Sequence, residues 1–130
     1  MKKKRFSIII ISSISISLLL SIAAYAITLT TKTVSMNASS SSIKYFETTG
    51  YDTTLAAIMV RNYITVDGDK FSDWTKEVSN TRTCDDSRTW PSDPGFLGCE
   101  FVGKVSRYYK VNSGDRDMTF SASQQDSDIL

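Results

Sequence analysis

The chain has 130 residues, which is enough for one domain. It contains no histidine and two cysteines, which excludes Ser-His-Asp and Cys-His catalysis and leaves too few ligands for a zinc site. The net charge is +1, but four of the 15 basic residues lie at the N-terminus and all 14 acidic residues follow them.

Residues 1–26 have the three parts of a secretory signal peptide. A Lys-Lys-Lys-Arg start precedes an apolar run interrupted by serines, and Ala24 and Ala26 frame a small-x-small cleavage site. We predict cleavage after Ala26, which would release residues 27–130 as a secreted protein of net charge −3. A domain this acidic lacks the basic clusters that nucleic acid or anionic lipid requires, so no nucleic-acid partner is predicted.

The same segment can also be an uncleaved membrane anchor. From Phe6 to Leu29 the chain carries no charge, and about 20 apolar residues span a hydrocarbon core. The interspersed serines weaken it as a permanent span, so cleavage is the prediction we prefer. With an anchor, the domain would stay at the outer face of the membrane and touch the membrane only through this segment.

Three segments in the first half of the remaining chain are typical of β-strands, because Thr, Val, Ile and Tyr favour a pleated surface. The first changes the parity of its apolar positions, which predicts a bulge. The third is apolar on both faces and predicts a central strand, although its Leu-Ala-Ala-Ile-Met stretch also suits a helix. These predicted strands are residues 27–36, 43–48 and 53–66, with a turn at 49–52.

Asp67-Gly68 predicts a β-hairpin, because a type I′ turn needs positive φ at both central residues. Residues 70–79 are then expected to return antiparallel as an edge strand. Asp67, Asp69 and Asp73 also suggest a calcium loop, but the fifth and sixth positions of an EF-hand loop hold Phe and Ser here. We therefore predict no metal and no cofactor.

Cys84 and Cys99 both follow the predicted signal, and a pair of cysteines outside the cell usually forms one disulfide. Their spacing is not the Cys-x-x-Cys of redox enzymes. The segment between them, residues 85–98, holds two prolines and two glycines, which favour turns. We predict a structural disulfide that closes a loop between two strands.

The last third of the chain predicts two more strands. Residues 100–111 alternate apolar and polar side chains, which is typical of a strand with one buried face. Residues 117–123 are expected to return with Phe120 inward, and residues 124–130 are expected to fray as a polar tail. The sequence therefore predicts an all-β domain over residues 27–123, a small antiparallel β-sandwich of six or seven short strands.

The preferred candidate binding loop lies inside the predicted disulfide loop and consists of Asp85, Asp86, Arg88 and Trp90. Trp and Arg are common interface anchors, and loops held on a rigid sheet often carry binding sites. The alternative is structural: Trp90 packs over the sheet, which we favour for this residue, and Arg88 pairs with a neighbouring aspartate.

Tyr108 offers a second candidate surface. It is expected to point outward from its strand, flanked by Lys104 and Lys110, where it can contact a carbohydrate or a membrane surface. An ordinary cross-strand ladder is the interpretation we prefer.

These features predict a secreted or cell-surface bacterial protein that binds an unidentified protein or cell-wall component, with no catalytic residues. A two-carboxylate glycosidase needs a deep cleft that so small a domain rarely builds, and no Gly-rich phosphate loop is present. With its Lys-started signal, short strands and a late Tyr-Tyr pair, the chain resembles in plan small secreted proteins of Gram-positive bacteria, including β-sandwich bacteriocins of the lactococcin type. That resemblance implies the alternative function of a secreted antibacterial toxin, although the Gly- and His-rich composition of that group is missing.

Overall fold

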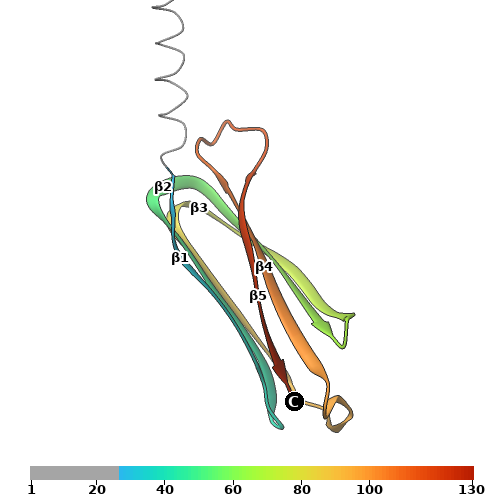
Figure 1. The fold of residues 1–130 in the computed structure, drawn as a ribbon. Helices are drawn as coiled ribbons and strands as arrows, with labels where there is room; N and C mark the ends of the chain where they lie inside the picture. Colours follow the sequence, from blue (N-terminus) through green and yellow to red (C-terminus); the bar gives the residue numbers. More distant parts are fainter. Residues whose placement is uncertain (1–26) are drawn as a thin grey trace, which may run out of the picture.

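A computed structural model describes residues 27–130, so the predicted signal peptide and its cleavage residues Ala24 and Ala26 lie outside the described residues. The described part consists of antiparallel strands and one short 3-10 helix (Figure 1). No helix in this part is long and apolar enough to cross a membrane. The elements are β1 (Leu29–Ala38), β2 (Ser42–Val66), β3 (Asp69–Pro91), η1 (Pro94–Phe96), β4 (Glu100–Lys110) and β5 (Thr119–Ile129).

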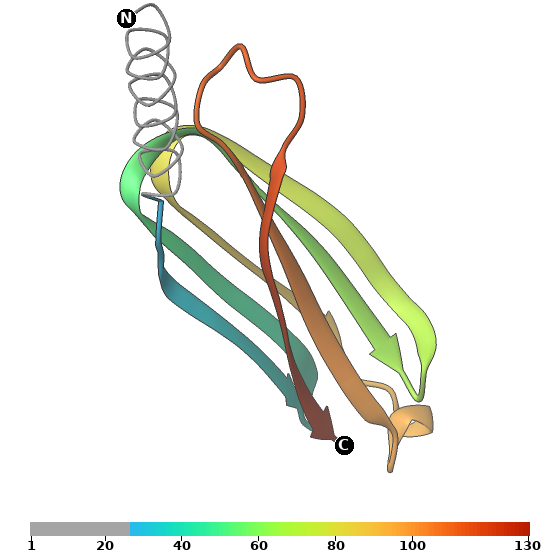
Figure 2. The same cartoon turned by 45° about the horizontal axis from the view of Figure 1, so that its top comes forward.

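The centre of the fold is a long hairpin ribbon made of β2 and β3, which have 25 and 23 residues. Strands usually have fewer than about ten residues, and this ribbon bends midway rather than ending (Figure 2). The pairing shifts register between Gly50 and Leu55, and Asn80 has a positive φ of 52° at the bend of β3. The first half of β2 pairs with β1, and its second half pairs with β4, which in turn pairs with β5.

The bend makes one curled five-stranded sheet whose two halves face each other across the core. The all-β antiparallel prediction is confirmed. The predicted count of six or seven strands in a sandwich is wrong, because β2 runs through the segments 43–48 and 53–66 that were expected to be separate strands. The helix alternative within residues 53–66 is also wrong, since this segment is strand throughout and both of its edges are paired over residues 57–66.

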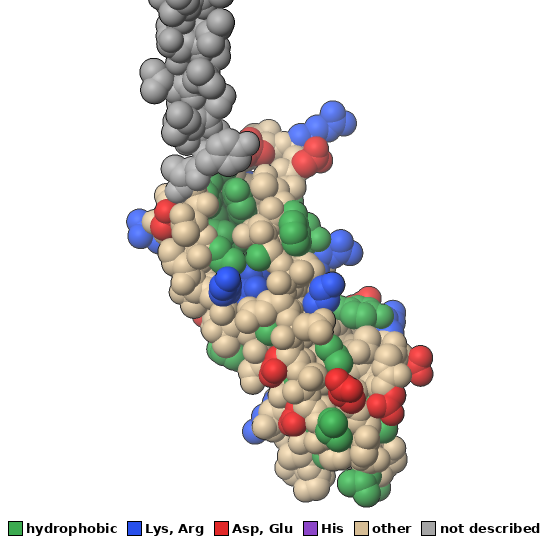
Figure 3. Space-filling model, in the orientation of Figure 1, with side chains coloured by type: hydrophobic (Ala, Val, Ile, Leu, Met, Phe, Trp, Pro, Cys, Tyr) green, Lys and Arg blue, Asp and Glu red, His purple; other side chains and the backbone are tan. Residues whose placement is uncertain are grey.

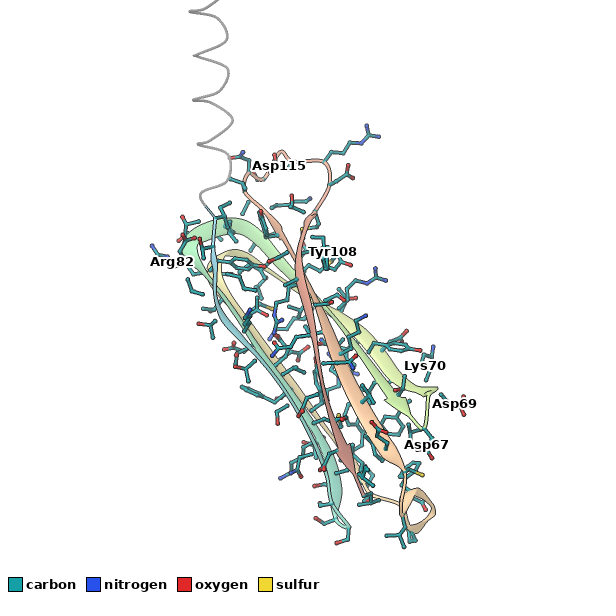
Figure 4. The ribbon with its side chains drawn as sticks, in the orientation of Figure 1. Asp67, Asp69, Lys70, Arg82, Tyr108 and Asp115 are labelled. Carbon is teal, nitrogen blue, oxygen red and sulfur yellow. The ribbon has the colours of Figure 1, made fainter. Side chains whose placement is uncertain are left out.

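The hairpin turn after β2 is confirmed. Asp67 and Gly68 have positive φ values of 49° and 86°, and Val66 pairs with Asp69 on either side of the turn. The Asp67 carboxylate also accepts a hydrogen bond from the backbone N–H of Glu100 at 2.8 Å, so the turn is fastened to the start of β4 (Figure 4). The parity change near the start of β1 is likewise a bulge, between Leu29 and Thr31.

The predicted frayed tail, residues 124–130, is wrong, because it forms most of β5. Two of its aspartates reach the edge of β1: Asp126 accepts from the backbone N–H of Met36 and Asp128 from that of Ala38, each at 2.8 Å. These carboxylates replace hydrogen bonds that a neighbouring strand would supply to the β1 edge. The polar residues that suggested a frayed tail therefore bind β5 to β1 and close the curled sheet on that side.

The core lies between the two halves of the sheet and is made of aliphatic and aromatic side chains from β1 to β4. Burial of each large apolar side chain contributes about 1.5–3 kcal/mol. The fully covered members are Ile43, Ile58, Val60, Ile64, Phe101 and Val105.

Gly103 on β4 lies where two core side chains leave no room. A Cβ atom at this position would lie 2.8 Å from the ring of Tyr45 and 3.1 Å from the sulfur of Met36. We expect Gly103→Ala to lower the free energy of unfolding by about 1–3 kcal/mol through overpacking, measured by urea denaturation. Gly114→Ala is the matched control, because a Cβ there meets nothing within 4 Å; equal stability of the two variants would contradict this packing.

The predicted disulfide is wrong, because Cys84 and Cys99 are both free. Cys84 is buried in β3 opposite Thr49, near the bend, whereas Cys99 lies beyond the far end of that strand. The strand continues to Pro91, and seven residues of strand span roughly 23 Å. The prolines and glycines of the predicted loop are confined to the end of β3, η1 and the short connection to β4.

The two thiols are expected to differ in reactivity. Burial raises the pKa of the Cys84 thiol to about 11, and a hydrogen bond with Asp67 raises that of the partly exposed Cys99. We expect an alkylating reagent to modify Cys99 slowly in the folded protein and Cys84 only after unfolding, since the thiolate is the nucleophile. Intact mass measured under non-reducing conditions shows which thiols are alkylated. If neither cysteine is modified in denaturant, the two form the predicted disulfide after all.

Candidate functional site

The residues of the predicted binding loop lie on β3 instead. Asp85 faces outward, whereas Asp86, Arg88 and Trp90 alternate with it and share the face of the buried Cys84. The structure therefore brings three of the four predicted residues together and turns Asp85 away. These three residues lie on the second half of β3, where it faces Trp74 on the first half of the same strand.

These side chains contact one another and the neighbouring Trp74. The Asp86 carboxylate accepts hydrogen bonds from the Trp74 indole N–H at 2.6 Å and from the Asn62 side-chain amide at 3.1 Å. The Arg88 guanidinium stacks over the Trp74 ring at 4.2 Å, a cation–π contact. Trp90 packs edge-on against Trp74 with ring centroids 5.7 Å apart, so the packing predicted for Trp90 is confirmed. The Asp86 carboxylate is therefore occupied by two donors from within the cluster, which favours a structural role.

A second polar cluster lies fully buried between the halves of the sheet. Arg107 on β4 and Glu47 on β2 both have no exposed surface, and Thr49 bridges them. The Arg107 Nε donates to the Thr49 hydroxyl at 2.8 Å, and that hydroxyl donates to the Glu47 carboxylate at 2.7 Å. The Arg107 Nη2 also donates to three oxygens at 3.2 Å, on Thr33, Thr48 and Gln124.

Burial dominates the electrostatics of this cluster. Removal from water raises the pKa of Glu47 to about 7, against a smaller lowering by the Thr49 hydrogen bond and by Arg107. The same desolvation lowers the pKa of Arg107. Within residues 27–130, Glu47 Oε1 and Arg107 Nη1 have no hydrogen-bond partner. Because Arg107 binds β1, β2 and β5 from β4, its role is to hold four strands together.

Sequence reasoning missed this cluster, although a signal was present. Arg107 has the same strand parity as the inward Phe101 and Val105, and Glu47 has the same parity as the inward Ile43 and Tyr45. A charged residue at an inward position of each of two strands is the pattern that indicates a buried pair.

The remaining candidate is a groove of about 480 Å³ on the outer face of the sheet, where β3, β2 and β4 run side by side. Its side chains form rows across the three strands. Arg61 is in the middle row, between Thr75 and Ser106. The next row holds Tyr63 on β2, beside Lys104 on β4.

Tyr108 and Asp73 complete the lining of this groove. Tyr108 projects from β4 on the side away from β1 (Figure 4) and packs edge-on against Phe120 with centroids 5.5 Å apart. Phe120 is thus outward and 57% exposed, contrary to the prediction, because a bulge between Arg107 and Tyr108 reverses the parity of β5. The two groove tyrosines lie on opposite sides of Arg61. Tyr63 is two residues from Arg61 along β2, and Tyr108 is two residues from Ser106, the partner of Arg61 on β4.

The charge of the groove is positive. Asp73 lies 3.8 Å from Lys70, and this is the one ion pair within residues 27–130. Arg61 and Lys104 have no such partner in the same part of the chain. The groove therefore carries two uncompensated cations on a domain whose net charge is −3.

The sequence identified only part of this site. It placed Tyr108 and Lys104 together on an outward face, but not Arg61 and Tyr63, whose strand was expected to be largely buried. Of the acidic residues of the hairpin, Asp67 accepts the hydrogen bond from Glu100 and Asp69 follows at the start of β3 (Figure 4). No group of three or more Cys, Asp or Glu residues able to hold a metal ion occurs in the described chain.

No protein-family model matches the chain, and no curated protein matches it either. Among solved structures, it is similar to the solution structure of AT1g01470 from Arabidopsis thaliana, with a TM-score of 0.48 and 6% identity over 78% of this chain and 80% of that one. It is also similar to the crystal structure of a protein from Archaeoglobus fulgidus, with a TM-score of 0.41 and 9% identity over 79% of this chain and 98% of that one. Similarity at this level gives no information about the function of this chain.

Proposed function

We propose that this chain is an exported or surface-held binding protein, and that the groove across β3, β2 and β4 binds a polar polymer of the cell wall. The observation that carries the proposal is the groove itself, which combines two tyrosines, two cations and hydroxyl groups on one rigid sheet. Aromatic faces and directed polar groups together are the usual means by which a protein holds a polar ligand.

One face of the molecule favours a polar partner over an apolar one. On the face drawn in Figure 3, hydrophobic side chains form small separate patches and not one continuous area. A stable protein–protein interface would normally require a larger apolar centre. The proposed location outside the cytoplasm rests on the signal-like sequence of residues 1–26.

Sedimentation with insoluble peptidoglycan sacculi tests this function. The full-length chain, purified in detergent, is expected to pellet with the sacculi. Tyr63→Ser should weaken binding by about 1–2 kcal/mol, or roughly fivefold to 30-fold, because it removes a stacking face from the groove.

Phe46→Ser is the matched control, because Phe46 is 43% exposed, close to the 41% of Tyr63, and lies on the other half of the sheet. It should bind sacculi as the unchanged protein does. Failure of the unchanged protein to pellet, or equal losses for the two variants, would contradict binding at the groove.

A further inference from the structure

We infer that the groove recognises the carboxylates of an acidic polysaccharide, an inference that rests on the groove being the binding site proposed above. Arg61 supplies a guanidinium whose planar fork matches a carboxylate, and Lys104 supplies a second cation from the next strand. Tyr63 and Tyr108 supply faces on which sugar rings can pack.

The distribution of charge favours an anionic occupant. The domain as a whole has net charge −3, yet the two groove cations have no acidic partner within residues 27–130. Asp73, the acidic residue of the groove, has its own counter-charge in Lys70 at 3.8 Å. A concave surface concentrates the field of its charges, so the groove attracts anions although the domain as a whole repels them.

The arrangement favours sugars over a nucleic acid. Arg61 lies between the two tyrosines on the paired strands, so a chain along the groove would meet an aromatic face, a cation and a second aromatic face in turn. Thr75 and Ser106 flank Arg61 and can exchange hydrogen bonds with sugar hydroxyls. Two cations are few for a polynucleotide, which is held by an extended basic surface.

The test compares two polymers with the same sugar backbone, polygalacturonate and its uncharged methyl ester. Affinity electrophoresis of the full-length chain in detergent is expected to show binding to polygalacturonate about tenfold tighter than to the ester. The double variant Arg61→Gln/Lys104→Gln should lose about this tenfold preference, because both charged contacts are gone. Added salt should weaken binding to polygalacturonate and leave binding to the ester unchanged.

The control variant, Lys44→Gln/Arg82→Gln, removes the same number of charges from exposed positions away from the groove. It should retain the preference for polygalacturonate. A loss as large as that of the groove variant would show that net charge alone governs binding and would overturn the inference.

The remaining outcomes separate this inference from the function on which it rests. Equal binding of the two polymers, with loss in Tyr63→Ser, would overturn carboxylate recognition and leave the groove as a binding site. Equal binding of single-stranded DNA and polygalacturonate would overturn recognition of sugars. Binding of neither polymer would also overturn the inference, and sedimentation with sacculi then decides the proposed function independently.

Discussion

Replacing Arg107 with leucine is expected to lower the free energy of unfolding by about 3–5 kcal/mol at pH 8, because it leaves the buried Glu47 carboxylate without a counter-charge. The hydrogen bonds from Arg107 to β1, β2 and β5 are lost at the same time. The total free energy of unfolding of a domain of this size is typically about 5–15 kcal/mol, so the variant should be close to unfolding. Urea denaturation followed by tryptophan fluorescence measures the change.

Two further variants show whether the cause is the buried pair. Arg82→Leu removes an exposed arginine and should change the free energy of unfolding by no more than about 0.5 kcal/mol. Arg107→Leu combined with Glu47→Gln should recover part of the loss, since no charge is then left buried. If the single change at Arg107 costs no more than that at Arg82, the buried cluster does not hold the strands together.

Glu47 should make the protein more stable at mildly acidic pH than at pH 8. Burial raises its pKa in the folded protein from 4.5 to about 7, so the folded state keeps a proton that the unfolded chain releases between those values. The free energy of unfolding is therefore highest below about pH 4.5, falls as pH rises to about 7, and then levels off. At 1.36 kcal/mol for each pKa unit, the fall is about 3 kcal/mol.

Glu47→Gln tests the assignment of this pH dependence, because glutamine can still accept the Thr49 hydrogen bond but has no charge to desolvate. Denaturation curves between pH 4.5 and 8 should become nearly flat for this variant. Glu77→Gln, an exposed change on β3, should keep the original profile. The lowered pKa of Asp67 acts in the opposite sense and below this window. A Glu47→Gln profile as steep as the original would show that another group titrates.

The features that sequence predicted correctly are those with a local physical cause. Asp67-Gly68 gives a type I′ turn because its own backbone preferences specify one. The strand over β4 follows from the alternation of its apolar side chains. The cover on both faces of β2 between Leu55 and Val60 follows from an apolar run too rich for a surface strand.

The features that sequence missed depend on residues far apart in the chain. Nothing between Thr49 and Asp52 shows that the strand bends and continues, because the bend is specified by pairing with β1, β3 and β4. In the sequence, Asp126 and Asp128 are simply polar residues near the end of the chain. Their role depends on the edge of β1, whose backbone N–H groups they bind. Arg61 gains its place in the groove only through the register of β2 with β3 and β4.

The cysteine prediction failed for a related reason. Compartment and count both favour a disulfide, and the prolines and glycines between Cys84 and Cys99 suggest a loop. The extended ribbon instead continues through Trp90 to Pro91, because these residues pair with β2 in register. The thiols are therefore separated by the length of the extended strand, which the number of residues between them does not reveal.

Amide chemical-shift mapping during titration with a short oligogalacturonate tests binding at the groove most directly. The largest shifts should fall on Arg61, Tyr63 and Ser106, with small shifts at Phe46 on the other half of the sheet. Largest shifts at Arg88 on β3, or no shifts at saturating oligosaccharide, would contradict it.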